Sequence, residues 1–337
     1  MQVADLSTPS VVARRPSGQP HELRRFLLRR ILTLLVTLWL ASVLVFLVLN
    51  ILPGKPAQVI LGTQATPSSV AALTAKLGLN RPLVDQYLHW IHGLVTLNLG
   101  NSYISAQPIA PVIGAALEVT GPLVLAGLVV GLLIAIPLGI ASALRHTRRS
   151  GIVLSGIAQI GIAIPNFVLG ILLIIVFAVD LKVLPASGFT TWSTSVTGAL
   201  QSLVLPAVAL GLVEGAILAR YIRASIIEVL RADYLRTARA KGLRPNQALI
   251  RHGLRNASIP VLTVFGLELS GLIIGAVVIE AVFTLPGLGS LLLSSVANRD
   301  LITVQDIVML VATTVLVVNT IVDILYRVID PRMGLRS

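Results

Sequence analysis

Six long apolar stretches alternate along this chain with polar segments rich in Lys and Arg. They cover residues 31–51, about 119–144, part of 150–179, about 203–226, about 259–283 and about 303–327. A helix needs about 20 apolar residues to cross a hydrocarbon core about 30 Å thick. The pattern therefore predicts an all-α polytopic membrane protein with six transmembrane helices.

Composition and charge support this prediction and orient the chain. The residues are 55% apolar and 12% charged, with a mean hydropathy of +0.91, which excludes an ordinary soluble domain. With the N-terminus inside, 21 of the 26 Lys and Arg residues fall in cytoplasmic tails and loops. The positive-inside rule then predicts that both termini are cytoplasmic. Basic residues near anionic headgroups also account for the net charge of +12 without a nucleic-acid partner.

The N-terminal region divides into a predicted cytoplasmic tail, residues 1–30, and a membrane domain, residues 31–337. A basic start before an apolar run also describes a signal peptide, but the run at 31–51 exceeds the usual h-region of about 7–15 residues. Leu52, Pro53 and Gly54 follow where small residues would be required for cleavage. We therefore expect a retained first helix, with residues 23–30 forming a short helix along the membrane surface.

Several classes of chemistry are absent from the sequence. There is no cysteine, which excludes thiolate nucleophiles, disulfides and Cys metal sites. His89 and His92 are spaced i, i+3 but lack a third ligand nearby, which favours solvated histidines over a metal site. No phosphate-binding P-loop string occurs. An intramembrane hydrolase is a rival hypothesis, but Ser155 and Ser270 have no histidine at membrane depth. We predict no catalytic residue, metal site or cofactor in this chain.

The segment 232–260 is basic although it lies between two apolar stretches. Its first half predicts a short amphipathic helix with small and apolar residues on one face and cations elsewhere. The apolar face comprises Ala232, Leu235, Ala238 and Gly242, and the cations are Arg236, Arg239 and Lys241. Gly242 and Pro245 are expected to end this helix. The pattern is typical of a docking segment, although an ordinary basic loop would share its charge.

The string RTARAKGL, with Asp233 and Tyr234 before it and RHGLRNASIPVLT after it, resembles the cytoplasmic loop of permeases in bacterial ABC importers of the dipeptide/oligopeptide/nickel family. Arg236, Thr237 and Ala238 stand where the wider class has Glu-Ala-Ala, and Pro260 comes later than the usual proline. Outer segments that resemble the same family are LPGKPA at 52–57, GLNRPLVDQYLHWIHGLVTLNLGNSY at 78–103, LPASG at 184–188, GAVVIEAVFTLPGLGSLL at 275–292 and NRD at 298–300.

This resemblance implies a type I importer permease, specifically the first, B-type permease of a peptide system in the bacterial inner membrane. It implies four kinds of partner: a second permease, two ATPases that bind ATP and Mg, an extracytoplasmic binding protein, and the lipid bilayer. Residues 52–118 would form a periplasmic loop and 228–258 the ATPase-coupling loop. The coupling residues implied are Arg236, Thr237, Ala238, Arg239, Lys241, Gly242 and Leu243. Gly242 would permit close backbone approach there, and Ala238 would keep the docking face thin.

The implied function is import of di- or oligopeptides by alternating access, with hydrolysis left to partner chains. The same scaffold could carry nickel, glutathione or another small solute, and a passive channel is an alternative of a different class. Glu214, Glu268 and Asp323 are candidates for the translocation pathway, because carboxylates within spans are costly and often functional. The alternative is structural pairing, of Glu214 with Arg220 and of Asp323 with Arg327.

Overall fold

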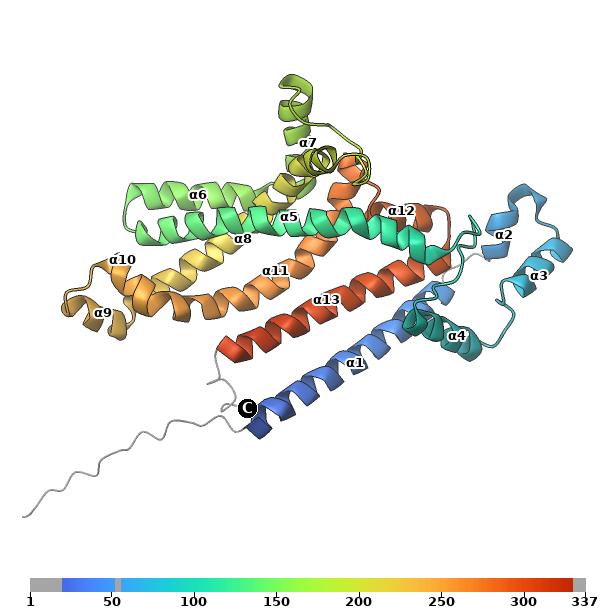
Figure 1. Ribbon diagram of the computed structural model, residues 1–337, viewed down its shortest axis with the longest axis horizontal. Coiled ribbons are helices and arrows are strands. Elements are labelled where there is room, and N and C mark those ends of the chain that lie inside the picture. Colours follow the sequence, from blue (N-terminus) through green and yellow to red (C-terminus); the bar gives the residue numbers. More distant parts are fainter. Residues whose placement is uncertain (1–19, 52–55, 330–337) are drawn as a thin grey trace, which may run out of the picture.

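A computed structural model describes residues 20–51 and 56–329, and most residues within these ranges are helical (Figure 1). The long helices are α1 (Pro20–Ile51), α5 (Ile109–Leu144), α6 (Arg149–Ala163), α8 (Val196–Arg231), α11 (Leu254–Phe283) and α13 (Leu301–Ile329). The shorter elements are α2 (Pro56–Leu61), η1 (Gly62–Gln64), α3 (Pro67–Lys76), α4 (Leu83–Thr96), α7 (Asn166–Leu173), η2 (Ile174–Asp180), α9 (Asp233–Ala240), α10 (Pro245–Ala248), η3 (Leu249–Gly253) and α12 (Leu288–Ala297).

Among the described residues, five single helices are long and apolar enough to cross a membrane, namely α1, α5, α8, α11 and α13. The third span, predicted within 150–179, consists of α6 followed by α7 with η2, which together are long and apolar enough for one crossing and are bent by 98° at their junction. Pro165 explains the break, because a proline disfavours helical geometry in the residue before it. Ile164 is accordingly extended, with φ −89° and ψ 120°.

The first and last long helices pack against each other (Figure 1). Helix α1 is continuous from Pro20, so the separate surface helix expected over 23–30 is wrong. An ion pair between Arg30 and Asp323 and the Arg327 guanidinium 4.3 Å from the Phe26 ring centroid join the two helices at this end. Their contact stabilises the extension of α1 beyond its apolar run. Residues 1–19, 52–55 and 330–337, which include most of the predicted tail, lie outside the described ranges.

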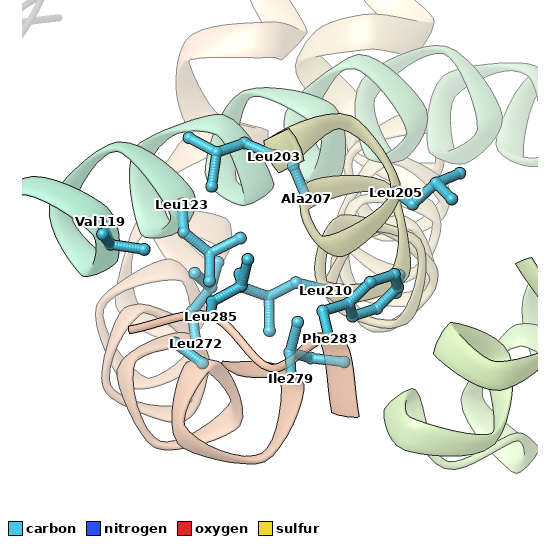
Figure 2. Packing of buried hydrophobic residues seen from close by; sticks show 12 residues of the cluster. Val119, Leu123, Leu203, Leu205, Ala207, Leu210, Leu272, Ile279, Phe283 and Leu285 are labelled. Atoms are coloured by element: carbon cyan, nitrogen blue, oxygen red, sulfur yellow. The ribbon is translucent and has the colours of Figure 1, made fainter. Parts of the chain in front are cut away.

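Helices α5 and α8 make the most extensive helix–helix contact in the described part of the bundle. Glycines let their backbones approach: a Cβ on Gly211 would lie 2.5 Å from the Gly127 carbonyl oxygen, and one on Gly215 would lie 2.8 Å from that of Gly131. Such small residues four apart are the usual basis of close packing between membrane helices. A buried apolar cluster adjoins this contact (Figure 2). It is formed by residues of α5, α8 and the outer part of α11, among them Leu123, Leu210 and Phe283.

The two ends of the bundle carry different elements. Helices α9 and α10 lie at the end where α1 begins and α13 ends, whereas α2, α3, α4 and α12 lie at the opposite end (Figure 1). The described ends of the chain therefore lie at the same end of the bundle. Within the predicted outer segment 52–118, the described residues 56–118 are mostly helical, and the last ten belong to α5.

A buried carboxylate holds α12 at the outer end. The Glu280 side chain is 0% exposed, and its Oε1 accepts a hydrogen bond of 2.5 Å from Thr120 Oγ1. Its Oε2 accepts from the backbone N–H groups of Gly289 and Ser290 at 2.7 and 3.2 Å. Thr120 Oγ1 in turn accepts from the Leu288 N–H at 2.8 Å. The Glu280 carboxylate on α11 therefore caps the first turn of α12 and, through its hydrogen bond with Thr120, ties α11 to α5.

Candidate functional site

The predicted docking segment connects two long helices at the cytoplasmic end. Helix α8 ends at Arg231, Ala232 is extended with ψ 142°, and α9 follows over Asp233–Ala240. Pro245 begins α10 rather than only turning the chain, and η3 leads directly into α11. Because α9 is joined to α8 at one end and through α10 and η3 to α11 at the other, a force on α9 reaches both helices.

The apolar face of α9 packs against this chain itself. Leu235 is 1% exposed and Ala238 is 9% exposed. They form a small cluster with Ala248, and Val229 and Leu243 pack against it. The expectation that Ala238 lies on a face presented to a partner is therefore wrong for this conformation. The small side chain of Ala238 instead lets α9 lie close to α10.

The opposite face of α9 is open. Arg236, Thr237, Arg239 and Lys241 are exposed. An ion pair of 3.5 Å joins Arg236 to Asp233, with both side chains largely in solvent, so it adds little stability. The Thr237 hydroxyl donates to the Asp233 carbonyl within the same helix, at 3.0 Å. The surface available for docking is therefore cationic and polar.

Gly242 is needed for the turn that follows α9. Its φ is +92°, a conformation that L side chains rarely adopt. Its N–H donates to the Arg239 carbonyl at 3.0 Å, and the N–H of Leu243 donates to that of Ala238 at 3.3 Å. These bonds satisfy carbonyls at the end of α9. The close approach expected at Gly242 does not occur within the described part of the chain, since a Cβ there would have no neighbour within 4 Å.

The segment is fixed to the bundle by polar contacts. The buried Ser225 hydroxyl on α8 donates to the Ala257 carbonyl on α11 at 2.7 Å. Asn256 Nδ2 donates to the Tyr234 hydroxyl on α9 at 3.1 Å. These bonds connect α8, α9 and α11 at one end of the molecule. The three helices are therefore suited to move together.

The structure brings two of the three candidate pathway carboxylates close together and places the third elsewhere. A Cβ placed on Gly271 would lie 3.7 Å from Glu214 Oε1 and 4.0 Å from Glu268 Oε2. The carboxylates of Glu214 on α8 and Glu268 on α11 therefore lie near each other. Glu214 Oε2 is buried without a hydrogen-bond partner among the described residues. Asp323 lies apart from them, paired with Arg30.

The partners expected from sequence spacing were wrong in detail. Asp323 pairs with Arg30 on α1 rather than with Arg327 on its own helix. Arg220, expected near Glu214, has its guanidinium carbon 5.1 Å from the centroid of the Tyr221 ring. Sequence reasoning also missed Glu280, although an acidic residue just before an outer loop in an apolar stretch is a detectable signal.

This arrangement defines a class of protein: a polytopic helical membrane protein whose inner end exposes a short cationic helix. Residues 135–335 match the family described as "Binding-protein-dependent transport system inner membrane component", and residues 23–132 match the corresponding N-terminal family. The chain belongs to this family of permeases. It is therefore a pore-forming, non-catalytic subunit of an ABC importer and a multi-pass protein of the inner membrane.

Curated relatives extend over nearly the whole chain. The "Glutathione transport system permease protein GsiC" of Escherichia coli strain K12 is 39% identical over 306 residues, which cover 91% of this chain and 97% of the relative. Proteins with the same description from Shigella flexneri serotype 5b and Salmonella choleraesuis are 39% and 38% identical over the same shares. This similarity covers both ends of the bundle, including the segment around α9.

Proposed function

We propose that this permease, with a second related permease, forms the pathway through which small peptides enter the cytoplasm, glutathione included. The resemblance to peptide permeases and the glutathione description of the curated relatives support the same substrate class, because glutathione is itself a small peptide. Two ATPases would bind ATP and Mg at the cytoplasmic end, and an extracytoplasmic binding protein would deliver substrate at the outer end.

The observation that carries the coupling role is the position of α9. Its inner face is held by Leu235 and Ala238, its outer face bears Arg236, Arg239 and Lys241, and its two ends lead to α8 and α11. Closure of the ATPase dimer would move α9 as a rigid body and tilt both helices, which is a rigid-body route to alternating access. Arg and Lys would meet acidic or carbonyl groups on the ATPase.

The pathway we propose passes the Glu214 and Glu268 carboxylates. They lie on α8 and α11, the two helices that α9 would move, and Gly271 leaves the space between them open. Peptides with a free N-terminus carry an ammonium group that such a pair attracts. Asp323 has a different role in this proposal, because its ion pair with Arg30 holds α1 on α13.

Co-purification tests the coupling role. The native chain should bring down a second permease and ATPases, and replacing Arg236, Arg239 and Lys241 together by Ala should release the ATPases while keeping the permease. A matched control replaces the exposed Arg145, Arg148 and Arg149 at the same end of the bundle. Equal ATPase loss from both triple variants would show a general charge effect and contradict docking through α9.

Uptake by proteoliposomes containing the purified complex and its binding protein tests the substrate class. We expect ATP-dependent uptake of labelled glutathione or a labelled di- or tripeptide, and no uptake of nickel. Substrate flux without ATP would indicate a passive channel instead. ATP-dependent nickel uptake with no peptide uptake would overturn the substrate assignment but preserve the transporter class.

A further inference from the structure

Helix α4, at the outer end of the bundle, carries apolar side chains on a face that packs against nothing in the described part of the chain. Val84, Leu88 and Val95 are 67%, 57% and 79% exposed. They are spaced four and seven residues apart, so they share one face of this 14-residue helix. Single exposed apolar residues are common, but an aligned set of three marks a surface that contacts something apolar. We call this set the outer stripe.

The face of α4 next to the outer stripe is fixed to two membrane spans. Tyr87 shares a 2.8 Å hydrogen bond with the buried Ser42 of α1. The ring of Trp90 stacks with that of Phe46 on α1, with centroids 6.2 Å apart. Trp90 Nε1 also donates to Asp306 Oδ1 on α13 at 2.8 Å. These contacts hold α4 at a defined level beside the outer half of α1 (Figure 1).

That level lies inside the membrane. The apolar run 31–51 of α1 is about 31 Å long at about 1.5 Å per residue, which matches a hydrocarbon core about 30 Å thick. Ile51 therefore lies near the outer boundary of the hydrocarbon. Ser42, nine residues earlier, lies about 14 Å inside that boundary along the helix. Asp306 is likewise five residues, or about 8 Å, beyond Leu301, where α13 begins.

The surroundings of α1 at this level are apolar. Leu44 and Leu47 lie at the same level as the residues that hold α4, and they are 64% and 45% exposed. A membrane-spanning helix presents such side chains to lipid. Because α4 is joined to α1 at this level, lipid that surrounds α1 is also in reach of the outer stripe.

The polar face of α4 is turned to a different environment. Asp85 and His89, one helical turn apart, are exposed and line a cavity of about 680 Å³ that Lys76 and Arg81 also line. The outer stripe takes no part in this lining. Helix α4 therefore separates a polar cavity from an apolar surface, which is the arrangement of an amphipathic helix at a membrane interface.

We propose that α4 lies in the outer leaflet of the bilayer, with the outer stripe against lipid acyl chains and Asp85 and His89 toward water. The helix anchors the outer segment between α1 and α5 to the membrane without crossing it. Lipid is the occupant that fits, because the stripe lies at the level of the exposed Leu44 and Leu47 of α1, below the reach of a soluble protein. This role is independent of the solute that the importer carries.

Spin labels on single cysteines test the proposal, because the chain has no cysteine of its own. Leu88→Cys and Val95→Cys place a nitroxide on the outer stripe. Asp85→Cys and Thr96→Cys are the matched controls, at exposed neighbouring positions on the polar face. Each variant is labelled in the purified complex in phosphatidylcholine nanodiscs, and the complex with the cysteine-free chain gives the background from partner subunits.

Power-saturation EPR then compares the access of oxygen, which concentrates in lipid, with that of a neutral nickel chelate, which stays in water. We expect the oxygen-to-chelate ratio to be at least fivefold higher at Leu88→Cys and Val95→Cys than at the two controls. All four positions are exposed, so the labels should leave the packed face of α4 intact.

Two results would overturn the proposal. Equal ratios on both faces, or ready access of the chelate to the outer stripe, would place the stripe in water. Exclusion of both oxygen and the chelate from the Leu88 and Val95 positions would show that a protein covers the stripe, either the second permease or the binding protein.

Discussion

Replacement of Glu280 offers the sharpest test of how the outer end is held together. The carboxylate is fully buried and accepts three hydrogen bonds, from Thr120 and from the backbones of Gly289 and Ser290. Hydrogen bonds to a charged group contribute about 1.5–3 kcal/mol each. Glu280→Ala removes both acceptor oxygens and with them all three hydrogen bonds. Water entering near the outer surface recovers part of the loss, so we expect a cost of about 3–5 kcal/mol.

Glu280→Gln should be milder. Its remaining oxygen can still accept from the two N–H groups of α12, and its amide can donate to Thr120 Oγ1, so the loss is mainly that of charge and amounts to about 1–2 kcal/mol. The free energy of unfolding is measured by titrating purified protein in mixed micelles with sodium dodecyl sulfate. Glu228→Gln, at an exposed carboxylate on α8, is the control and should change stability by less than about 0.5 kcal/mol. A cost below 1 kcal/mol for Glu280→Ala, or equal costs for the Ala and Gln variants, would refute the capping role.

Other predictions concern the helix contacts and the coupling segment. Gly211→Val should destabilise the chain by about 2–4 kcal/mol in the same titration, because its Cβ would collide with the Gly127 carbonyl, whereas Gly156→Val, with open space around it, should not. Ala238→Leu should displace α9, because Ala238 is packed in a buried cluster with Leu235 and Ala248. We expect ATP-dependent uptake to fall while membrane insertion stays normal, and unchanged uptake would contradict this packing. Gly242→Leu should also reduce uptake, since a φ of +92° disfavours any side chain, and full transport with full stimulation of ATP hydrolysis would refute this account.

The membrane spans were largely predictable because each depends on a local quantity, the number of consecutive apolar residues. Five of the six predicted spans appear as single helices, each longer than its apolar run. The remaining one, predicted within 150–179, is built from two helices bent by 98° around Pro165, where the rule about the residue before proline competes with apolar length. The basic segment around α9 was also visible in the sequence, through its small, apolar and cationic residues at helical spacing, although its charge alone is shared by ordinary basic loops.

What the sequence could not determine is which surfaces face each other. Apolar spacing predicted that Leu235 and Ala238 share a face of α9, but whether that face meets a partner or this same chain depends on where α10 folds. Likewise, helical spacing made Arg327 the expected partner of Asp323, whereas packing of α1 on α13 brought Arg30 to it.

Apolar length and charge along the chain were enough to predict the membrane spans, their orientation and the position of the basic segment around α9, because hydrophobicity and charge act on each stretch independently. The approach of Glu214 to Glu268 and the capping of α12 by Glu280 could be seen only once the helices were packed together. These features join residues from different helices or distant turns. They depend on helix rotation and depth, which side-chain packing sets once the helices come together.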